Sequence, residues 1–383
     1  MVTTCSGTEA PLAALADLPN IAELPDPFLS LDGTRITRAD QWACRRVEIA
    51  AQAETYELGA KPAKPASVTG AFDAGKITVT AGENGKTVSF AATITPPTTG
   101  VGTPPYPAMI GIGGISIGST QLADMGVATI TFPNDTVAQQ MSGSSRGRGV
   151  FYDLYGSDHT AGAMMAWAWG VSRLIDALEQ TTATAQIDTA RLGVTGCSRN
   201  GKGALIAGAF DERIALTIPQ ESGSGGAASW RVSDAQYASG TVVQTLWEIV
   251  TENVWFTRSF SQFGYVPKQL PFDHHTIEGL VAPRALLIIE NTSQVWLGNM
   301  STYNNSMAAH AIWEALGMPD KMGVSQIGDH AHCVWNGSQQ AEVTAYVQKF
   351  LIGGGTGNTG VLRTDGGYTF NEAMWAPWDV PAL

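Results

Sequence analysis

The chain has 383 residues, of which 44% are hydrophobic and 15% are charged, and its formal net charge is −12. These values are typical of a folded globular protein and argue against a disordered chain. The negative charge argues against binding to nucleic acid or to an anionic membrane surface. No run of about 20 apolar residues is present, so we predict no membrane span.

The composition and the sequons are compatible with a secreted protein. Glycine, alanine, serine and threonine are abundant while charged residues are few, which is compatible with an extracellular protein. No signal peptide is visible at the start of the chain, and we expect secretion with that signal already removed. Five asparagines stand in N-x-S/T sequons, which would carry glycans in a secreted protein: Asn134, Asn291, Asn299, Asn304 and Asn336.

The N-terminal region predicts one helix and a pair of strands. Residues 1–65 are rich in proline, alanine and leucine, and we expect an N-terminal wrap with a helix over 38–56. Apolar and polar residues alternate over 76–80 and over 87–94. This period of two predicts two antiparallel strands at the edge of a sheet.

Buried strands are predicted next. Residues 108–115 are an apolar run that enters a group of glycines, and residues 126–132 form a second apolar run. In α/β-hydrolases the loop after such a strand donates backbone N–H groups to an oxyanion. The glycines do not match G-x-G-x-x-G, so no dinucleotide site is predicted. The apolar stretch 161–179 predicts a long helix, with Trp167 and Trp169 in the core.

A serine lies between a short strand and a helix in the middle of the chain. Residues 192–195 have strand character, Ser198 follows among glycines, and residues 204–210 favour a helix. Strand, sharp turn and helix form the nucleophile elbow of α/β-hydrolases. The usual pattern is G-x-S-x-G, whereas here Asn200 takes the last place and Gly201 follows it.

The rest of the chain continues to alternate between strands and helices. Strands are predicted over residues 214–219, 284–291 and 324–327, and helices over 241–256, 303–316 and 339–351. Residues 353–383 are expected to pack as an irregular C-terminal strap. Alternation of this kind predicts a three-layer sandwich with a mostly parallel central sheet. We expect an α/β-hydrolase fold in one domain over residues 1–383.

Three polar residues that end strands could form a catalytic triad. Ligands of such sheets bind beyond the carboxyl ends of the strands, and serine, acid, histidine is the chain order of α/β-hydrolases. Ser198 would be the nucleophile, which needs a histidine base, and that base needs an acid to orient it. The acid could be Glu221 or Glu290, and the residues alone leave these two even.

The positions of two cysteines bear on the choice of base between His330 and His332. Cys197 precedes Ser198, and Cys333 follows His332. If these cysteines are bridged, their Cα atoms lie roughly 5.5–6 Å apart, which would hold Ser198 close to His332. That pairing would favour His332 over His330.

The four cysteines of the chain permit three pairings. Besides the pair above, a bridge between Cys5 and Cys44 would clamp the N-terminal wrap. The cysteines form no C-x-x-C motif and no Cys/His cluster, so no metal site is predicted.

Charged and polar residues near the serine could bind a substrate. Lys202 lies one helical turn after Ser198, where an anionic or polyhydroxyl ligand could serve as its partner. Arg199 directly follows the serine, so its backbone N–H is an oxyanion donor by position. Three residues spaced by four share one face of the helix predicted over 241–256: Gln244, Glu248 and Glu252. They could bind a ligand, or they could simply form a solvated face of the helix.

One string of eleven residues, Val-Thr-Gly-Cys-Ser-Arg-Asn-Gly-Lys-Gly-Ala over 194–204, resembles the nucleophile motif of the fungal glucuronoyl esterases, carbohydrate esterase family 15. Asn200 belongs to that family's version of the motif. The family places its acid after the strand that follows the nucleophile helix, which implies Glu221. Its serine and histidine are flanked by bridged cysteines, and the string 330–333 is similar to its histidine loop.

The resemblance also implies roles in binding. It implies oxyanion stabilisation by the Arg199 side chain and sugar contacts by Gln244, Glu252 and Trp296, and we place Lys202 with them. The likeness extends over most of the chain, from Cys5 to about residue 351. Many fungal members carry a third disulfide, whose cysteines this chain lacks.

The function that the resemblance implies is hydrolysis of 4-O-methylglucuronoyl esters that join glucuronoxylan to lignin alcohols. It would proceed through an acyl-enzyme on Ser198, with neither cofactor nor metal, in a secreted and monomeric enzyme. Two alternatives stay open. One is another secreted carboxylesterase, such as an acetyl-xylan or feruloyl esterase, and the other is a carbohydrate-binding protein with an inactive hydrolase fold.

Overall fold

The computed structural model describes residue 5 and residues 12–383. Within this part, one mixed sheet has ten strands: β1 Ser67–Asp73, β2 Lys76–Glu83, β3 Lys86–Thr95, β4 Tyr106–Ile112, β5 Ala128–Phe132, β6 Ile187–Cys197, β7 Ile214–Gln220, β8 Ala285–Glu290, β9 Met322–Gln326 and β10 Leu362–Thr364. Its order is β1-β2-β3-β5-β4-β6-β7-β8-β9-β10. From β5 to β10 neighbouring strands are parallel, while β1, β2 and β3 are antiparallel.

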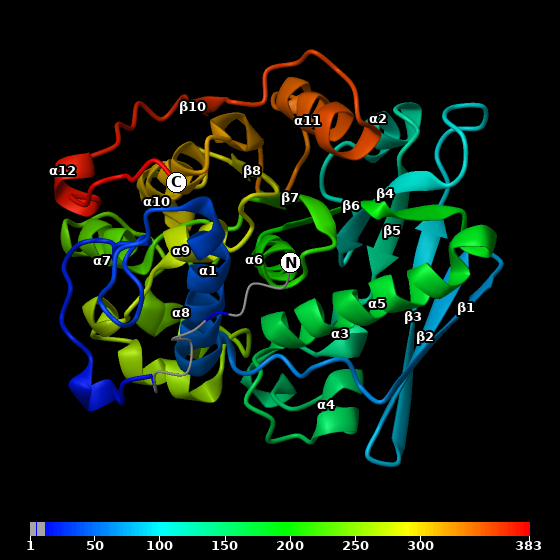
Figure 1. Cartoon of the computed structure of the whole chain (residues 1–383), viewed down its shortest axis with the longest axis horizontal. Coiled ribbons are helices and arrows are strands. Elements are labelled where there is room, and N and C mark those ends of the chain that lie inside the picture. The colour runs from blue at the N-terminus through cyan, green and yellow to red at the C-terminus, as the bar shows by residue number, and fades with distance from the viewer. Residues whose placement is uncertain (1–4, 6–11) are drawn as a thin grey trace.

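Helices cover both faces of this sheet: α1 Ala39–Ala53, α2 Ser119–Asp124, α3 Asn134–Val137, α4 Val150–Tyr155, α5 Ala163–Ala185, α6 Arg199–Phe210, α7 Trp230–Ala238, α8 Leu246–Glu252, α9 His274–Gly279, α10 Asn299–Ala315, α11 Gln340–Val347 and α12 Glu372–Trp375. In Figure 1, α11 and α2 lie on one side of the strands, and α5 and α6 lie on the other. The three-layer α/β-hydrolase sandwich with a mostly parallel sheet is therefore confirmed.

Successive side chains of the central strands point to opposite faces of the sheet, so the core has two layers. In β8, Leu286 and Ile288 join the large core cluster beneath α5, α6 and α10. Their neighbours Leu287 and Ile289 point to the other face, where they pack near Tyr346 of α11. Side chains of a strand alternate between faces, so a parallel strand buried on both sides reads as a continuous apolar run. Trp167 and Trp169 of α5 are fully buried, as predicted.

Several predicted boundaries differ from those found. The strands at 76–80 and 87–94 are antiparallel, as predicted, but β1 lies outside them and forms the edge of the sheet. The helix over 241–256 is wrong in length, because α8 covers only Leu246–Glu252. The strap over 353–383 is not wholly irregular, because it adds β10 beside β9 and contains α12.

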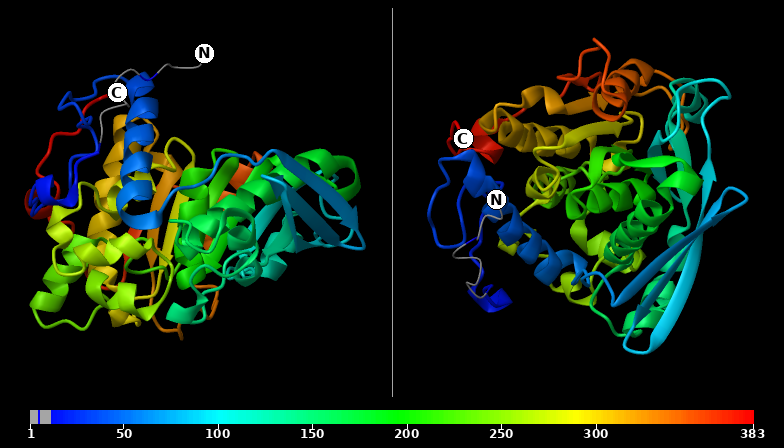
Figure 2. Two further views of the ribbon diagram at one scale, coloured as in Figure 1. Left: turned by 90° about the horizontal axis from the view of Figure 1, so that it is seen from below. Right: turned by 45° about the vertical axis from the view of Figure 1, so that its right-hand side comes forward.

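Both ends of the described chain lie far from the antiparallel edge. Figure 2 shows α1 and the C-terminal segment at the end of the molecule opposite β1–β3. The backbone N–H of Leu24 donates to Trp375 O at 2.8 Å, and Trp378 Nε1 donates to Leu24 O at 3.1 Å. The described part of the N-terminal wrap is thus bound to the C-terminal strap. Residues 1–4 and 6–11 of that wrap lie outside the described residues.

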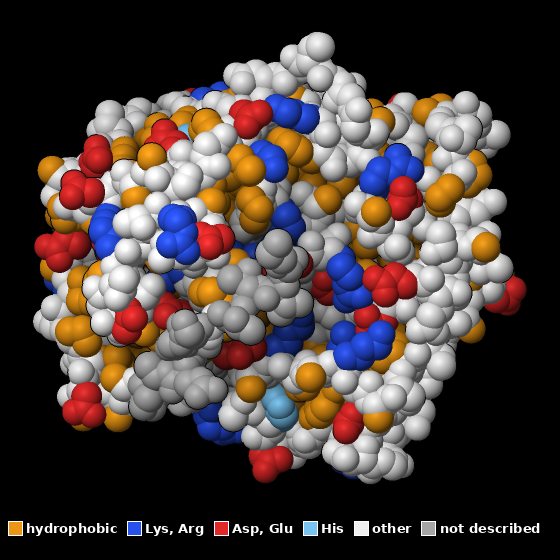
Figure 3. All heavy atoms as spheres, viewed as in Figure 1, with side chains coloured by type: hydrophobic (Ala, Val, Ile, Leu, Met, Phe, Trp, Pro, Cys, Tyr) orange, Lys and Arg blue, Asp and Glu red, His pale blue; other side chains and the backbone are white. Residues whose placement is uncertain are grey.

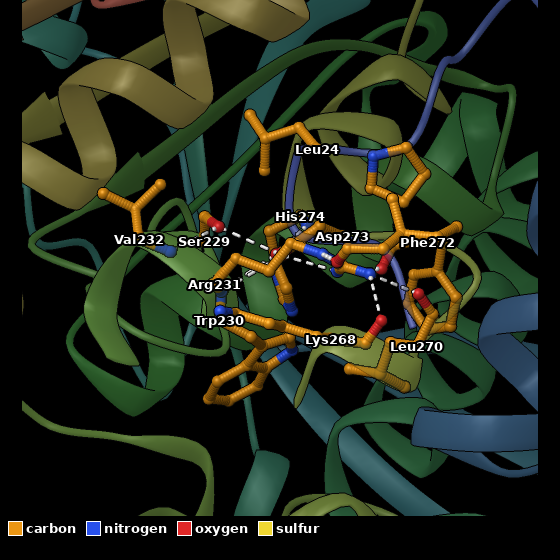
Figure 4. Close-up of polar contacts among 12 residues, drawn as sticks. Leu24, Ser229, Trp230, Arg231, Val232, Lys268, Leu270, Phe272, Asp273 and His274 are labelled. Carbon is orange, nitrogen blue, oxygen red and sulfur yellow. Dashed lines mark hydrogen bonds and ion pairs between the residues drawn. The ribbon is translucent and has the colours of Figure 1, made fainter. Parts of the chain in front are cut away.

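A buried ion pair links α7 to the residue that precedes α9 (Figure 4). Arg231 Nη1 and Asp273 Oδ2 are 3.0 Å apart, and both side chains are fully buried. Asp273 also accepts hydrogen bonds from the backbone N–H groups of Trp230 and His274, at the first residues of α7 and α9, and from the Ser229 hydroxyl. One carboxylate therefore satisfies donors at the starts of two helices.

No helix in the described part of the chain combines the length and apolarity needed to cross a bilayer.

Candidate active site

Ser198 lies at the tip of a strained turn between β6 and α6. Its φ and ψ are 59° and −129°, a conformation that non-glycine residues rarely adopt. Two glycines make room for the turn. A Cβ on Gly196 would lie 2.5 Å from Asn200 O, and one on Gly201 would lie 2.6 Å from Gln220 O. This explains why Asn200 can take the last place of the usual motif, since the close contact falls at Gly201.

His332 and Glu221 are hydrogen-bonded to each other beside this turn. His332 Nδ1 and Glu221 Oε2 are 2.8 Å apart, and the backbone N–H of Cys333 donates to the same oxygen at 3.0 Å. Burial raises the pKa of Glu221, but these two hydrogen bonds outweigh it and bring the pKa below its ordinary value. The carboxylate is therefore ionised and holds Nδ1 protonated, which leaves His332 Nε2 as the basic nitrogen.

Ser198 and His332 line one pocket of about 400 Å³. The loop after β4, from Gly113 to Ser116, forms another wall, and Arg199 closes the pocket at the start of α6. Among the described residues, His332 Nε2 has no hydrogen-bond partner. The pocket thus brings together a strained serine, a free basic nitrogen and the loop predicted to supply oxyanion donors.

The disulfides settle which cysteines are paired. Cys197 is bonded to Cys333 with Cα atoms 5.8 Å apart, and Cys5 is bonded to Cys44. Both predicted pairings are confirmed. Cys197, Cys333, Glu221 and His332 place possible metal ligands within 4.8 Å of one another. Because the two sulfur atoms are bonded to each other, they provide no thiolate for a metal.

His330 takes a different position. Its side chain is only 5% exposed, and it is absent from the residues that line the pocket of Ser198. Asn291 Nδ2 lies 3.1 Å from His330 Nδ1 and donates to His330 O at 2.9 Å. His330 Nδ1 is 3.8 Å from Glu221 Oε1, so this imidazole packs behind the carboxylate. The geometry places His332, and not His330, beside the serine.

Glu290, the other candidate acid, lies behind the turn that carries Glu221. Its Oε1 accepts from the backbone N–H of Ser222 at 2.9 Å and of Gly223 at 3.1 Å. Burial raises the pKa of Glu290 to about 8, with a further increase from the charge of Glu221 and an opposing effect of Lys202. No hydrogen bond joins Glu290 to either histidine within the described chain. The sequence alone did not decide between the two acids, and in the structure it is Glu221, not Glu290, that is bonded to His332.

Lys202 is buried and is not the solvated lysine that its position could suggest. It is 3% exposed, its Nζ donates to Ser222 O, and the same atom lies 5.8 Å from the centre of the Trp255 ring. Burial lowers the pKa of Lys202 to about 8, while the charges of Glu290 and Glu252 oppose this shift. A lysine held in this way can donate to a polar ligand that excludes water from it.

The remaining predicted sugar contacts form a chain beside the pocket. Gln244 Nε2 donates to Glu252 Oε2 at 2.5 Å, and the Gln244 backbone N–H donates to Trp296 O at 3.0 Å. The Trp296 ring lies edge to face with His332, with centroids 5.1 Å apart, and is 40% exposed. The prediction that Gln244 shares a helix face with Glu252 is wrong, because α8 begins at Leu246. Their side chains meet through the bend that precedes α8.

Neither Lys202 nor these three residues is among those that line the pocket of about 400 Å³ itself. They lie next to it, so the reacting ester group and the rest of a ligand would contact different residues.

Sequence reasoning missed two residues that contact the acid. Gln220, at the end of β7, donates to Glu221, and Asn291, which follows β8, donates to Glu221 and to His330 O. Their position at the ends of strands, where ligands of such sheets bind, is the feature of the sequence that could have identified them.

The sequence of this chain is similar to that of known fungal enzymes. A family model described as glucuronyl esterase, fungi, matches residues 77–317. A 4-O-methyl-glucuronoyl methylesterase of Podospora anserina is 49% identical over 99% of this chain and 78% of its own length. Another from Hypocrea jecorina is 48% identical over 99% of this chain and 79% of its own length.

Solved structures agree with these relatives. The glucuronoyl esterase catalytic domain from Hypocrea jecorina has a TM-score of 0.93 and 48% identity, covering 98% of this chain and 100% of that one. A serine-to-alanine mutant of the Sporotrichum thermophile enzyme was solved in complex with methyl 4-O-methyl-β-D-glucopyranuronate. It has a TM-score of 0.91 and 48% identity, covering 96% of this chain and 97% of that one. Because the family model spans more than half of the chain and these relatives cover nearly all of it, the chain belongs to the family of fungal glucuronyl esterases.

Proposed function

We propose that this protein is a serine esterase that hydrolyses 4-O-methylglucuronoyl esters, including those that join glucuronoxylan to lignin alcohols. The observation that carries the proposal is the single pocket that Ser198 and His332 share, with Nδ1 of that histidine bonded to buried Glu221. The substrate class is supported by the similar enzyme whose structure holds methyl 4-O-methyl-β-D-glucopyranuronate.

In the proposed reaction, Ser198 Oγ attacks the carbonyl carbon of the ester while His332 Nε2 takes the hydroxyl proton. The Arg199 backbone N–H and its side chain would stabilise the oxyanion. The alcohol then leaves with the proton from His332, and the uronoyl group remains on the serine. Water attacks this acyl-enzyme with His332 again as the base, which releases the uronate. Glu221 stabilises the imidazolium in both steps.

Sugar specificity is assigned to the residues beside the pocket. Lys202, Gln244 and Glu252 would bind hydroxyl groups of the uronate, and Trp296 would pack against the apolar face of its ring. We also propose that the protein is a monomer and is secreted. Secretion is supported by the two disulfides, which are typical of oxidising compartments. Asn336 is exposed whereas the other four sequon asparagines are buried, so a glycan would be carried there.

The decisive experiment compares methyl 4-O-methylglucuronate with a small aryl acetate as substrates. Glu252→Ala should lower kcat/KM for the sugar ester by roughly one to two powers of ten, because a charged group would lose its bond to a ligand hydroxyl. Hydrolysis of the aryl acetate should stay nearly unchanged, since it has no sugar to bind.

Glu248→Ala is the matched control, since this exposed acid on α8 makes no side-chain bond among the described residues. A parallel fall of both activities in Glu252→Ala would remove the site-level support for a glucuronoyl ester. A higher rate on acetylated xylan or feruloyl esters than on the uronate ester would favour the general carboxylesterase instead. Loss of all turnover in Ser198→Ala is required in either case.

A further inference from the structure

Two arginines without a carboxylate partner line one small cavity beside α8. The cavity, of about 210 Å³, is lined by Arg146, Arg258 and Gly143 together with residues that end α8 or follow it: Val250, Thr251, Asn253, Val254, Phe256, Thr257 and Ser261. No acidic residue is among these. Most arginines in the described part pair with a carboxylate, as Arg231 does with Asp273, but neither Arg146 nor Arg258 does so there.

The Arg146 guanidinium is held in place by the protein while most of its donors remain free. Its Nη1 donates to Phe256 O at 2.9 Å, which is its single side-chain hydrogen bond within the described residues. Burial lowers the pKa of Arg146; Tyr152 opposes this shift, and the nearby charge of Arg258 adds to it. Arg146 is partly withdrawn from water and lies near the like charge of Arg258, which carries an electrostatic cost that an anion between them would remove.

The cavity adjoins the proposed sugar site. Thr251 and Asn253, which line it, are the chain neighbours of Glu252 on either side. Trp255 lies beneath Lys202, and the Phe256 carbonyl that follows it anchors Arg146. The end of α8 and the segment that follows it therefore connect the proposed sugar site with the residues that line the cavity.

We propose that Arg146 and Arg258 form a subsite for the carboxylate of a second, unesterified uronate on the same glucuronoxylan chain. This inference rests on the proposed function. A cavity of this size is below the usual range for a whole drug-sized ligand, roughly 300–1,000 Å³, and suits a carboxylate with part of its sugar ring. The protein carries a net charge of −12, which repels an acidic polysaccharide, so a local cationic site would offset that repulsion.

Three ester substrates test the subsite: methyl 4-O-methylglucuronate, a neutral xylo-oligosaccharide with one esterified uronate, and the same oligosaccharide with an additional free uronate. The wild-type protein should prefer the acidic over the neutral oligosaccharide by roughly three- to tenfold in kcat/KM at low salt. Because the contact is ionic and partly exposed, this preference should shrink as ionic strength rises.

Arg258→Gln should abolish the preference while leaving kcat/KM for the monosaccharide ester unchanged, and it should leave the fold intact because Arg258 is exposed. Arg146→Gln should act in the same way. Arg148→Gln is the matched control, because this exposed arginine lies on the same loop but does not line the cavity. That variant should keep the full preference.

Equal rates on the two oligosaccharides in the wild-type protein would overturn the subsite. So would a preference that persists in the Arg146→Gln, Arg258→Gln double variant. Failure of the proposed function is a separate outcome, since it would show as an absence of hydrolysis of the monosaccharide ester by the wild-type protein.

Discussion

Two buried carboxylates at neighbouring strand ends have opposite electrostatic surroundings. Glu221 follows β7 and accepts from His332 and from the Cys333 N–H, which lowers its pKa in spite of burial. Glu290 ends β8, and burial raises its pKa to about 8. One acid is therefore poised to stabilise a cationic histidine, while the other supports the turn that carries the first.

Exchanging each acid for glutamine should separate these roles. We expect Glu221→Gln to lower kcat by roughly two to four powers of ten, because the histidine loses the charge that fixes its tautomer. Glu290→Gln should keep kcat within a few-fold, since an amide oxygen can still accept from the N–H groups of Ser222 and Gly223. Initial rates on the same ester measure both. The reverse ranking would make Glu290 the triad acid.

Protonation of Glu290 also predicts how stability depends on pH. The ordinary glutamate pKa is 4.5 and that of Glu290 is about 8 in the folded protein. Between these values the folded state binds more protons than the unfolded state, so the free energy of unfolding should fall as pH rises from about 4.5 to 8. Glu290→Gln should flatten this decline in denaturant titrations at several pH values. Glu248→Gln, an exposed control, should keep the wild-type slope, and an equally steep decline in Glu290→Gln would refute the assignment.

At the scale of elements, the loop from Glu221 to Ser229 is held from behind. His274 places Nδ1 against Gly226 O and Nε2 against Glu57 Oε1 at 2.9 Å, so both ring nitrogens face acceptors. Burial disfavours the charged ring, but Glu57 raises the pKa of His274 above its ordinary value. The first residues of α7 and α9 are bound by Asp273 in the same region (Figure 4).

Removing the Asp273 carboxylate should therefore destabilise the protein strongly. Asp273→Ala leaves the buried charge of Arg231 without a partner, for which the expected loss is about 3–5 kcal/mol of unfolding free energy. Chemical denaturation measures this loss. If Asp273→Ala does not fold, the unfolding free energy of Asp273→Asn is measured instead. This variant keeps a hydrogen-bond acceptor, so its loss of unfolding free energy should be smaller. Glu248→Ala controls for removal of an acid, and a comparable change in both variants would contradict the role of the ion pair.

Sequence patterns predicted elements best where burial produces a long apolar run. The central strands and the long helix of Trp167 were found in this way, whereas the elbow at Ser198 was found from a serine among glycines between a short strand and a helix. β1 was missed because its side chains alternate between exposed and half-buried, so Ser67–Asp73 contains few large apolar residues. β10 has only three residues and forms by pairing with β9, which no local pattern reveals.

Features that depend on contacts between residues distant in sequence could not be predicted. α8 ends at Glu252 because Asn253 turns away into an extended conformation and donates to Gln140 O at 2.7 Å. The choice between Glu221 and Glu290 depends on which carboxylate meets His332, and that follows from how the histidine loop crosses the strand ends. Lys202 was expected near the nucleophile, but its burial against the Trp255 ring could not be predicted, because that contact forms only in the folded loop.

At the scale of the whole molecule, charges are dispersed and the two ends of the described chain are joined. Figure 3 shows acidic and basic side chains interspersed among uncharged atoms on the face it presents. The disulfide between Cys197 and Cys333 links the nucleophile elbow to the histidine loop across 136 residues. In addition, Leu24 is bound to Trp375 and Trp378, so the first and last described segments share one cluster.

These links lead us to expect that residues 1–383 unfold as one domain. Scanning calorimetry of the oxidised protein should give a single transition, with calorimetric and van't Hoff enthalpies in agreement. Trp378→Ala should lower the temperature of that whole transition, because its ring packs against Phe28 at a centroid distance of 5.7 Å and its Nε1 binds Leu24 O. An exposed change on the same strap, Met374→Ala, should shift the transition much less. Two resolved transitions in the wild-type protein, or an early separate transition in Trp378→Ala, would instead show that the terminal segments unfold independently of the sheet.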